Sequence, residues 1–200
     1  YSIVIIVTIY NNERKTSVLK TLILNGSPRK NGDTVSLLKI LKKNLQGEIK
    51  VVDAYYCNVA PCIDCRYCWK NPGCCVKDEM QEIYSYIEEC DNVLIASPIY
   101  FSELTGKLLD LGSRLQTYFS AKFFRNDMPI TKEKKSAVLL VGGGKGSMEK
   151  AFDTAQILLR DIKATNLFPL ISFHGTDDSV VAEDPEILKK LDELCDFFNS

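Results

Sequence analysis

The sequence predicts an α/β fold in which a mostly parallel sheet carries helices on both faces. Short apolar runs without polar alternation, such as 22–24 and 92–96, are typical of strands that are covered on both sides. Segments with helical spacing of apolar residues separate these runs, so that five strands alternate with five helices. Glycine-rich, polar or aromatic loops follow the first, third and fourth strands, as is usual for loops that bind a ligand.

The elements are expected in a regular order along the chain. The first strand leads through a polar loop to a helix that begins near residue 35, with Asp33 as its expected N-cap and Gly47 near its end. Further strands are expected at 48–56, 92–96, 136–141 and 168–173. Further helices are expected at 80–87, 104–119, 148–162 and 186–198, whereas 121–135 shows no clear period.

Residues 1–18 are expected to form an extension outside the main domain, which spans 19–200. The apolar run 3–10 is shorter than the roughly twenty residues that a membrane helix needs. No basic segment precedes it, so it does not resemble a signal peptide. The run predicts an extra edge strand or the tail of a preceding segment, joined by the polar linker 11–17.

Composition and charge narrow the class of function. The chain has 200 residues, of which 46% are apolar, and this predicts one globular domain. Its 25 basic and 26 acidic side chains leave a formal net charge of −1, which argues against nucleic acid or a membrane surface as the partner. Six of the eight cysteines lie between Cys57 and Cys75. This crowding indicates a local metal or redox site in a reducing compartment, so a cytoplasmic location is expected.

Three loops with binding chemistry are expected at one edge of the sheet. They are 26–34, 97–102 and 142–147, and each leaves the carboxyl end of a strand. The first loop enters a helix N-terminus, which suits a phosphate, and the others offer backbone and aromatic surface. Phosphate at one end and a planar ring at the other describe FMN. A dinucleotide is a weaker fit, because no G-x-G-x-x-G follows the first strand and no acidic residue ends the second.

Several motifs together resemble those of a known family. They are Gly26-Ser27-Pro28-Arg29-Lys30-Asn31-Gly32-Asp33-Thr34, Pro61-Cys62-x-x-Cys65-x-x-Cys68, Lys77-Asp78-Glu79-Met80, and Ser97-Pro98-Ile99-Tyr100-Phe101 followed by Thr105-Gly106. Over about residues 19–198 the sequence resembles the flavodoxin-like NAD(P)H-dependent FMN reductases and, within them, the iron–sulfur flavoproteins. The resemblance implies a flavodoxin-like three-layer sandwich with a five-stranded parallel sheet in the order 2-1-3-4-5. It also implies FMN as cofactor and NAD(P)H as reductant.

The same resemblance implies roles for individual residues. The FMN phosphate is expected on Ser27, Arg29, Asn31 and Thr34. The isoalloxazine ring is expected near Pro98, Ile99, Tyr100 and Phe101, with Gly142, Gly143 and Gly144 approaching it from the other side. Asp33 departs from the Ser or Asn that relatives often carry, and we expect it to turn away from the phosphate as a helix cap. No catalytic side chain is expected, because the flavin carries the chemistry.

The cysteine run predicts a second site whose occupant stays open. The spacing of Cys62, Cys65, Cys68 and Cys74 suits a [4Fe–4S] cluster, and the iron–sulfur flavoproteins use a run of this kind. Free or redox-active thiols are an equal alternative, and zinc is a weaker one because structural zinc sites usually take two separated pairs. Cys57 and Cys75 add ambiguity about which thiols would bind a metal. Cys90 and Cys195 are expected to be buried small hydrophobes.

The sequence therefore favours an FMN-dependent NAD(P)H oxidoreductase. It would pass electrons to a small acceptor, namely a quinone, a flavin, a nitro compound or a metal. The alternative is an iron–sulfur flavoprotein that acts as electron carrier or redox sensor with a protein partner, although the near-neutral charge favours the enzyme. Aromatic residues at 118–119 and 123–124 predict a homodimer or higher homo-oligomer. For His174 a capping or surface role is favoured over a catalytic one, and Lys145 is as well explained by solvation of its loop as by ligand binding.

Overall fold

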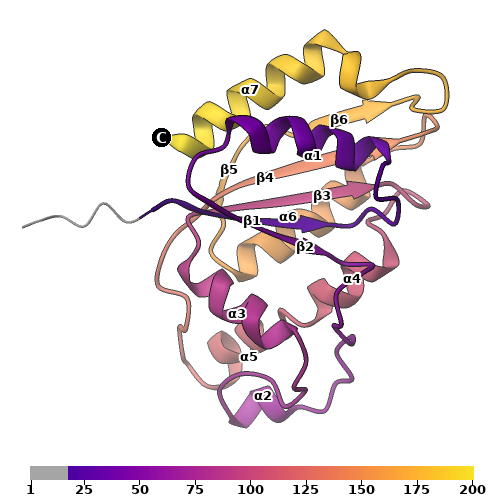
Figure 1. Ribbon diagram of the computed structural model, residues 1–200. Coiled ribbons are helices and arrows are strands. Elements are labelled where there is room, and N and C mark those ends of the chain that lie inside the picture. Colours follow the sequence, from indigo (N-terminus) through magenta and orange to yellow (C-terminus); the bar gives the residue numbers. More distant parts are fainter. Residues whose placement is uncertain (1–17) are drawn as a thin grey trace, which may run out of the picture.

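The computed structural model describes residues 18–200 and shows three layers, with a parallel sheet between two sets of helices (Figure 1). The expected edge strand at 3–10 and the linker at 11–17 lie outside the described residues. The elements in chain order are β1 (Lys20–Asn25), α1 (Asp33–Asn44), β2 (Glu48–Asp53), α2 (Tyr67–Lys70), α3 (Met80–Glu89), β3 (Asn92–Pro98), α4 (Gly106–Ser113), α5 (Gln116–Phe124), β4 (Lys135–Gly142), α6 (Glu149–Asp161), β5 (Asn166–Leu167), β6 (Ile171–His174), the 3-10 turn η1 (Val181–Glu183) and α7 (Pro185–Asn199).

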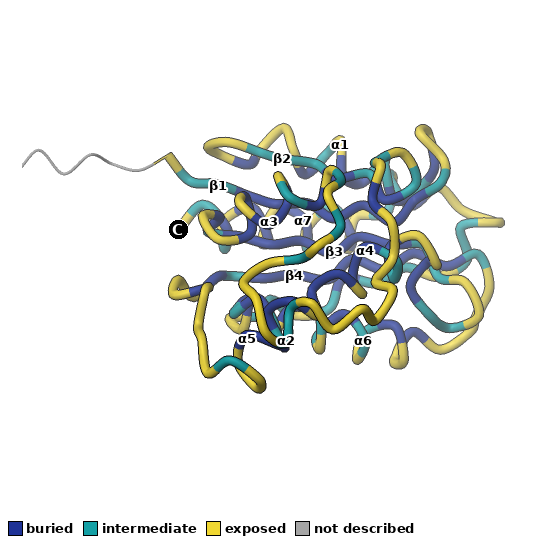
Figure 2. The backbone as a smooth tube through the Cα atoms, turned by 90° about the horizontal axis from the view of Figure 1, so that it is seen from below, coloured by how far each residue is buried: buried dark blue, intermediate teal, exposed yellow. Residues whose placement is uncertain are grey.

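The sheet has the order β2-β1-β3-β4-β5, and every pairing in it is parallel. This confirms the predicted fold class and strand order. Successive side chains of a strand point to opposite faces, so alternate residues of β1 enter different cores. Leu22 and Leu24 pack toward α3, α4 and α6, whereas Ile23 packs toward α1 and α7. Burial on both faces explains why these strands carry no polar alternation (Figure 2).

The predicted fifth strand is divided into β5 and β6, both of which pair with β4. Between them lie Phe168, Pro169 and Leu170. Proline has no backbone N–H to donate to a neighbouring strand, so the ladder is interrupted there and resumes at Ile171. Of the predicted strand 168–173, only the part from Ile171 is confirmed, since β5 ends at Leu167, before the predicted start.

The single helix predicted over 104–119 is wrong, because the structure has α4 and α5 with a break at Arg114 and Leu115. The N–H groups of these two residues donate to carbonyls only three residues back, Leu111 O (3.1 Å) and Gly112 O (2.9 Å). The carbonyl of Arg114 accepts a hydrogen bond from the Tyr84 hydroxyl at 2.8 Å and only a longer one, 3.4 Å, from the N–H of Thr117. A side-chain donor and a tightened turn therefore replace the regular helical ladder.

Two smaller expectations also need correction. The second strand ends at Asp53 rather than at residue 56, because the Asp53 carbonyl accepts the N–H groups of Tyr56 and Cys57 and turns the chain. Asp33 is not the N-cap of α1. Gly32 holds that position, and the Asp33 carboxylate accepts a hydrogen bond from Arg29 Nη2 at 3.2 Å.

None of the helices in the described part of the chain is long and apolar enough to cross a bilayer.

Candidate functional site

The three predicted loops lie at one edge of the sheet and contact one another. Because β1, β3 and β4 are parallel neighbours, their carboxyl ends emerge together. Gly26 N donates to Ala96 O at 2.8 Å, which joins the first loop to the end of β3. Ile99 N donates to Val141 O at 2.9 Å, which joins the second loop to the end of β4. The structure thus brings together the loops that the sequence predicts as one binding edge.

The first loop is held against β3 and α4 by a close backbone approach at Gly26. A Cβ at this position would lie 2.8 Å from Thr105 Oγ1 and 2.9 Å from Ser97 Oγ, so only glycine fits without displacement. Thr105 Oγ1 donates to the Gly26 carbonyl at 2.8 Å. Asn25 Oδ1 accepts the N–H of Ser27 at 3.0 Å. These bonds define the floor of the loop.

The four predicted phosphate residues divide into two pairs. Ser27 and Thr34 are buried in the floor of the loop. Arg29 is exposed and pairs with Asp33, and Asn31 Oδ1 accepts a hydrogen bond from Lys39 Nζ at 3.1 Å. The backbone suits an anion, because the first helical bond of α1 runs from Ser36 N to Gly32 O and leaves the preceding N–H groups of the first turn facing the loop. The donor set therefore fits a phosphate, and the role of each side chain stays a prediction.

The second loop presents its aromatic residues to solvent. Tyr100 and Glu103 exchange two backbone hydrogen bonds of 3.0 Å, which closes a tight turn. Phe101 and Ser102 at its centre have φ of 53° and 60°, a conformation that costs an L-residue about 1 kcal/mol or more. The Phe101 side chain is fully exposed, and that of Tyr100 is 46% exposed. A strained turn that exposes two rings suits a ligand better than packing, because neither ring is used in the core.

The glycine loop after β4 lies against the segment that follows β6. A Cβ on Gly143 would lie 2.5 Å from a carboxylate oxygen of Asp177, so any side chain there would displace that carboxylate. His174 Nδ1 lies 3.1 Å from the Gly144 carbonyl oxygen. The structure thus places His174 in contact with the glycine loop, and its role stays a prediction. Lys145 is exposed.

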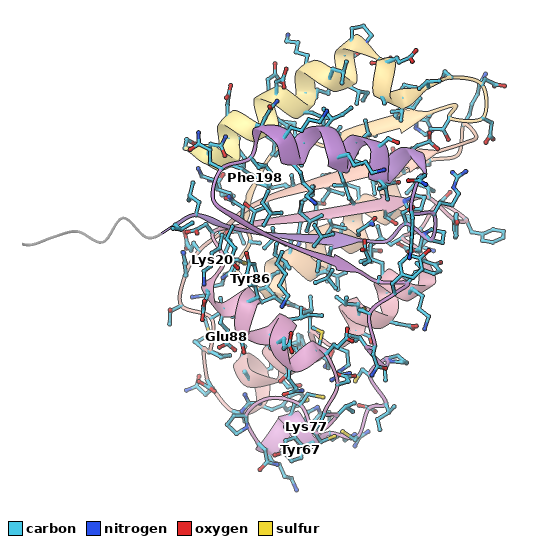
Figure 3. The ribbon with its side chains drawn as sticks, in the orientation of Figure 1. Lys20, Tyr67, Lys77, Tyr86, Glu88 and Phe198 are labelled. Atoms are coloured by element: carbon cyan, nitrogen blue, oxygen red, sulfur yellow. The ribbon has the colours of Figure 1, made fainter. Side chains whose placement is uncertain are left out.

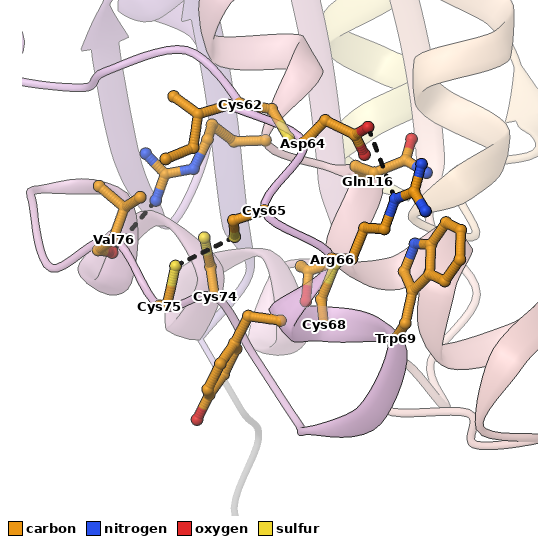
Figure 4. Close-up of a pocket in the computed structure, with 14 residues that line it drawn as sticks. Cys62, Asp64, Cys65, Arg66, Cys68, Trp69, Cys74, Cys75, Val76 and Gln116 are labelled. Carbon is orange, nitrogen blue, oxygen red and sulfur yellow. Dashed lines mark hydrogen bonds and ion pairs between the residues drawn. The ribbon is translucent and has the colours of Figure 1, made fainter.

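The predicted cysteine site is a pocket at the opposite end of α4 from Thr105, lined by five thiols (Figure 4). They belong to Cys62, Cys65, Cys68, Cys74 and Cys75. Cys68 Sγ donates to Ser120 Oγ at 3.3 Å, and the backbone N–H of Cys62 donates to Ser113 Oγ at 2.9 Å. Within residues 18–200, no set of three or more His, Cys, Asp or Glu side chains is arranged closely enough to hold one metal ion. The thiols thus share a pocket without forming a preassembled metal site.

The remaining cysteines differ in burial. Cys90 and Cys195 are buried, as predicted, and burial raises the pKa of each thiol to about 11. Cys57 does not line the pocket, and its Sγ contacts Ala54 O at 3.7 Å. Burial raises the pKa of Cys57 as well. These three thiols are therefore poor candidates for thiolate ligands.

The sequence interpretation missed Arg114, which organises the cysteine segment. Its side chain is almost fully buried and forms an ion pair with Asp78, with Nη1 2.6 Å from Oδ2. Nη1 also donates to Ala60 O at 2.8 Å, and Nη2 donates to Val76 O at 3.2 Å. Arg114 therefore ties the two ends of the segment together. The sequence did contain one indication of this role, because Arg114 interrupts the apolar helical pattern of 108–115.

The ion pair also sets the charge state of Asp78. Burial by itself would raise the pKa of this carboxyl group, but hydrogen bonds from Arg114 and from the N–H groups of Ala60 and Met80 lower it below its ordinary value. The pKa of Arg114 is raised by the same pairing, against the opposing effect of burial. The wall of the pocket lined by thiols thus contains an ion pair whose two opposite charges largely cancel.

Comparisons with known proteins agree with this geometry. Residues 19–175 match the family described as NADPH-dependent FMN reductase. An iron–sulfur flavoprotein of Archaeoglobus fulgidus is 28% identical over 182 residues, which cover 88% of this chain and 77% of the relative. An iron–sulfur flavoprotein of Clostridioides difficile is 37% identical over 90 residues, or 42% of this chain and 40% of the relative.

Solved structures show the same fold. The NAD(P)H:quinone oxidoreductase of Methanothermobacter marburgensis superposes with a TM-score of 0.66 at 16% identity, over 92% of this chain and 96% of that one. The FMN-dependent NADH-azoreductase of Bacillus anthracis, solved with FMN, gives 0.61 at 15% identity, over 90% of this chain and 100% of that one. The predicted family is confirmed, since the match covers most of the chain. The chain belongs to the NADPH-dependent FMN reductase family, and its chemistry is FMN-dependent oxidoreduction.

Proposed function

We propose that this protein takes electrons from NAD(P)H and passes them through FMN to a small acceptor such as a quinone, a flavin, a nitro compound or a metal. The observation that carries the proposal is the contact between three loops of complementary chemistry at the carboxyl edge of β1, β3 and β4. FMN, when bound, supplies the hydride and electron chemistry, and the protein supplies position and electrostatics.

The residues at this edge suit the two ends of FMN. In the proposal, Ser27, Arg29, Asn31 and Thr34 hold the phosphate together with the free N–H groups of α1. The ring lies beside Pro98, Ile99, Tyr100 and Phe101, where the exposed aromatic side chains exclude water. Gly142, Gly143 and Gly144 approach its other side with backbone N–H groups, which favour negative charge on the ring.

The test is an anaerobic titration of the purified yellow protein with NADH and, separately, with NADPH. Loss of the flavin absorption with at least one nicotinamide, followed by recovery when a quinone is added, is the expected result. A protein that binds FMN and is bleached by neither nicotinamide would contradict the enzyme and favour the electron carrier. Such a carrier would be reduced by dithionite and reoxidised by a partner protein.

We propose as a second candidate that Cys62, Cys65, Cys68 and Cys74 hold a [4Fe–4S] cluster, as a second redox group for either activity. The supporting observation is that these four thiols line one pocket, in a segment that the Arg114–Asp78 ion pair holds together. Anaerobically purified protein should then contain about four irons per chain. Cys62→Ser should lose the iron, whereas Cys57→Ser, outside the pocket, should retain it. Iron-free protein from the anaerobic preparation would end this proposal.

We further propose that the protein forms a homodimer or higher homo-oligomer through the surface around α5. Phe123, Met128 and Ile157 are each more than half exposed and lie around one cavity there. Phe123→Asp should shift the sedimentation coefficient toward the monomer, since a charge would enter an apolar contact. Val180→Asp, at an equally exposed apolar residue outside that cavity, is the control. A monomeric wild-type protein would contradict the proposal. The cytoplasmic location stays a prediction.

A further inference from the structure

Cys65 and Cys75 are the one pair of thiols in the described residues whose sulfur atoms lie within hydrogen-bond distance, with Sγ–Sγ 3.2 Å (Figure 4). Both side chains are exposed, and both are free thiols. Neither the flavin edge nor the proposed set of four iron ligands uses Cys75. The proposed flavin and iron sites therefore do not explain why Cys75 lies so close to Cys65.

The two thiols are held together by the parts of the chain that flank them. Arg114 bonds to Ala60 O before Cys65 and to Val76 O directly after Cys75. Because its guanidinium is buried and also paired with Asp78, the two limbs of the segment cannot drift apart without breaking this ion pair. A disulfide requires the sulfur atoms to come about 1 Å closer, to a bond length near 2.05 Å. Small rotations of two exposed side chains supply such a movement.

The surroundings suit a small anionic disulfide. Arg66, next to Cys65, is exposed and its Nε lies 3.8 Å from the Asp64 carboxylate. Lys77 is an exposed cation two residues after Cys75, and its Nζ donates to Cys74 O at 3.3 Å. Lys77 and Tyr67 are both exposed and both lie at the end of the molecule farthest from the sheet (Figure 3). An anionic tripeptide disulfide that approaches the sulfur pair therefore meets the free charge of Lys77 on one side and, on the other, the Arg66 guanidinium, which is shared with Asp64.

We propose that Cys65 and Cys75 are a thiol–disulfide exchange site for a low-molecular-weight disulfide of the glutathione class. The thiolate of one cysteine attacks a sulfur of the small disulfide, forms a mixed disulfide and releases one small thiolate. The second protein thiolate then attacks the protein-side sulfur, closes the Cys65–Cys75 bond and releases the other small thiolate. The protein dithiol loses two electrons and two protons, and the small disulfide is reduced to two thiols. Excess small thiol reverses both steps.

Closure of this bond has a consequence for metal binding. A disulfide sulfur is not a thiolate, so the oxidised pair removes Cys65 from the proposed iron ligands. The oxidised protein should then take up no iron until it is reduced. This consequence depends on the proposed cluster, whereas formation of the disulfide does not.

The test uses the full chain with FMN bound, purified with a chelator and exposed to oxidised glutathione under anaerobic conditions. After alkylation of the remaining thiols, trypsin cleaves after Arg66 and Lys70 and so separates peptide 51–66 from peptide 71–77. The expected main product is these two peptides joined and lighter by two hydrogen atoms than their sum. Fragmentation should place the bond between Cys65 and Cys75.

Serine variants decide whether the pairing is specific. Cys65→Ser and Cys75→Ser should each abolish the joined peptides, whereas Cys62→Ser and Cys74→Ser should retain them. Joined peptides in Cys75→Ser, their loss in Cys74→Ser, or a wild-type protein that ends only as glutathione adducts would each overturn the proposal. Loss of the flavin absorption on addition of NAD(P)H, measured in the same preparations, tests the flavin site independently. Failure of the proposed oxidoreductase can therefore be distinguished from failure of the proposed exchange site.

Discussion

Replacement of Arg114 by methionine tests the argument that one buried ion pair holds the cysteine segment in place. The change removes both hydrogen bonds to Asp78 (2.6 and 3.2 Å) and those to Ala60 O and Val76 O. Removing one partner of a buried ion pair typically costs about 3–5 kcal/mol, because the other charge is left buried. Asp78 keeps the N–H groups of Ala60 and Met80, at 3.0 and 3.1 Å. We therefore expect the lower end, a loss of about 3 kcal/mol in the free energy of unfolding.

The assay is urea unfolding, followed by circular dichroism at one fixed FMN concentration because bound ligand adds to the apparent stability. Arg66→Met is the matched control. Arg66 lies in the same segment, but it is exposed and its nitrogen is 3.8 Å from Asp64, so it should cost less than about 1 kcal/mol. Equal, small losses in both variants would refute the reasoning. Arg114→Met combined with Asp78→Asn should regain part of the loss, since no unpaired carboxylate stays buried.

The pH dependence of stability follows from the same pair. The folded state lowers the pKa of Asp78 below its ordinary value of 3.8. The stabilisation is therefore fully present above that value and is lost as the pH falls through the lower, folded pKa. In Arg114→Met the folded pKa should rise toward or above the ordinary value, so acid should destabilise this variant less, relative to its own stability at pH 7. An unchanged acid slope would show that Asp78 does not depend on Arg114.

Three further predictions concern the loops of the flavin edge. Gly26→Ala should lower the free energy of unfolding by about 1–3 kcal/mol through overpacking, because the new Cβ would lie 2.8–2.9 Å from three side-chain atoms. Gly106→Ala is the control, because a Cβ there would meet nothing within 4 Å, and it should leave the free energy of unfolding unchanged or raise it in the same urea experiment. Equal losses of stability in the two variants would contradict the packing argument. Arg29→Ala should weaken FMN binding roughly tenfold to a hundredfold by fluorescence titration, as expected for the loss of one charge-assisted bond to phosphate. Lys43→Ala, which removes an exposed cation at the other end of α1, is the control, and unchanged affinity in Arg29→Ala would contradict the prediction. Phe101→Gly should raise the free energy of unfolding by up to about 1 kcal/mol, because glycine adopts a positive φ without strain. If the Phe101 ring covers the flavin, the same variant should release FMN faster, and an unchanged release rate would show that Phe101 is not part of the site.

The sequence by itself determined the fold class, and its motifs determined the family, whose resemblance implied the order of the strands. Buried parallel strands such as β1 and β3 must be apolar on both faces, and this signal is local and strong. The loops that end these strands could be assigned to one edge for the same reason, because parallel strands bring their carboxyl ends together. The motif beginning at Gly26 was readable because close approach there excludes every side chain.

Only the tertiary structure decided what depends on contacts between distant residues. The break after α4 arises from Tyr84, thirty residues away, whose hydroxyl bonds the Arg114 carbonyl. Burial of Arg114 depends on Asp78, which no helical or strand period reveals. The pairing of Cys65 with Cys75, rather than with a thiol at closer sequence spacing, depends on how Arg114 folds the segment back on itself. Spacing along the chain places thiols in one segment, but which two sulfur atoms meet is set by long-range hydrogen bonds.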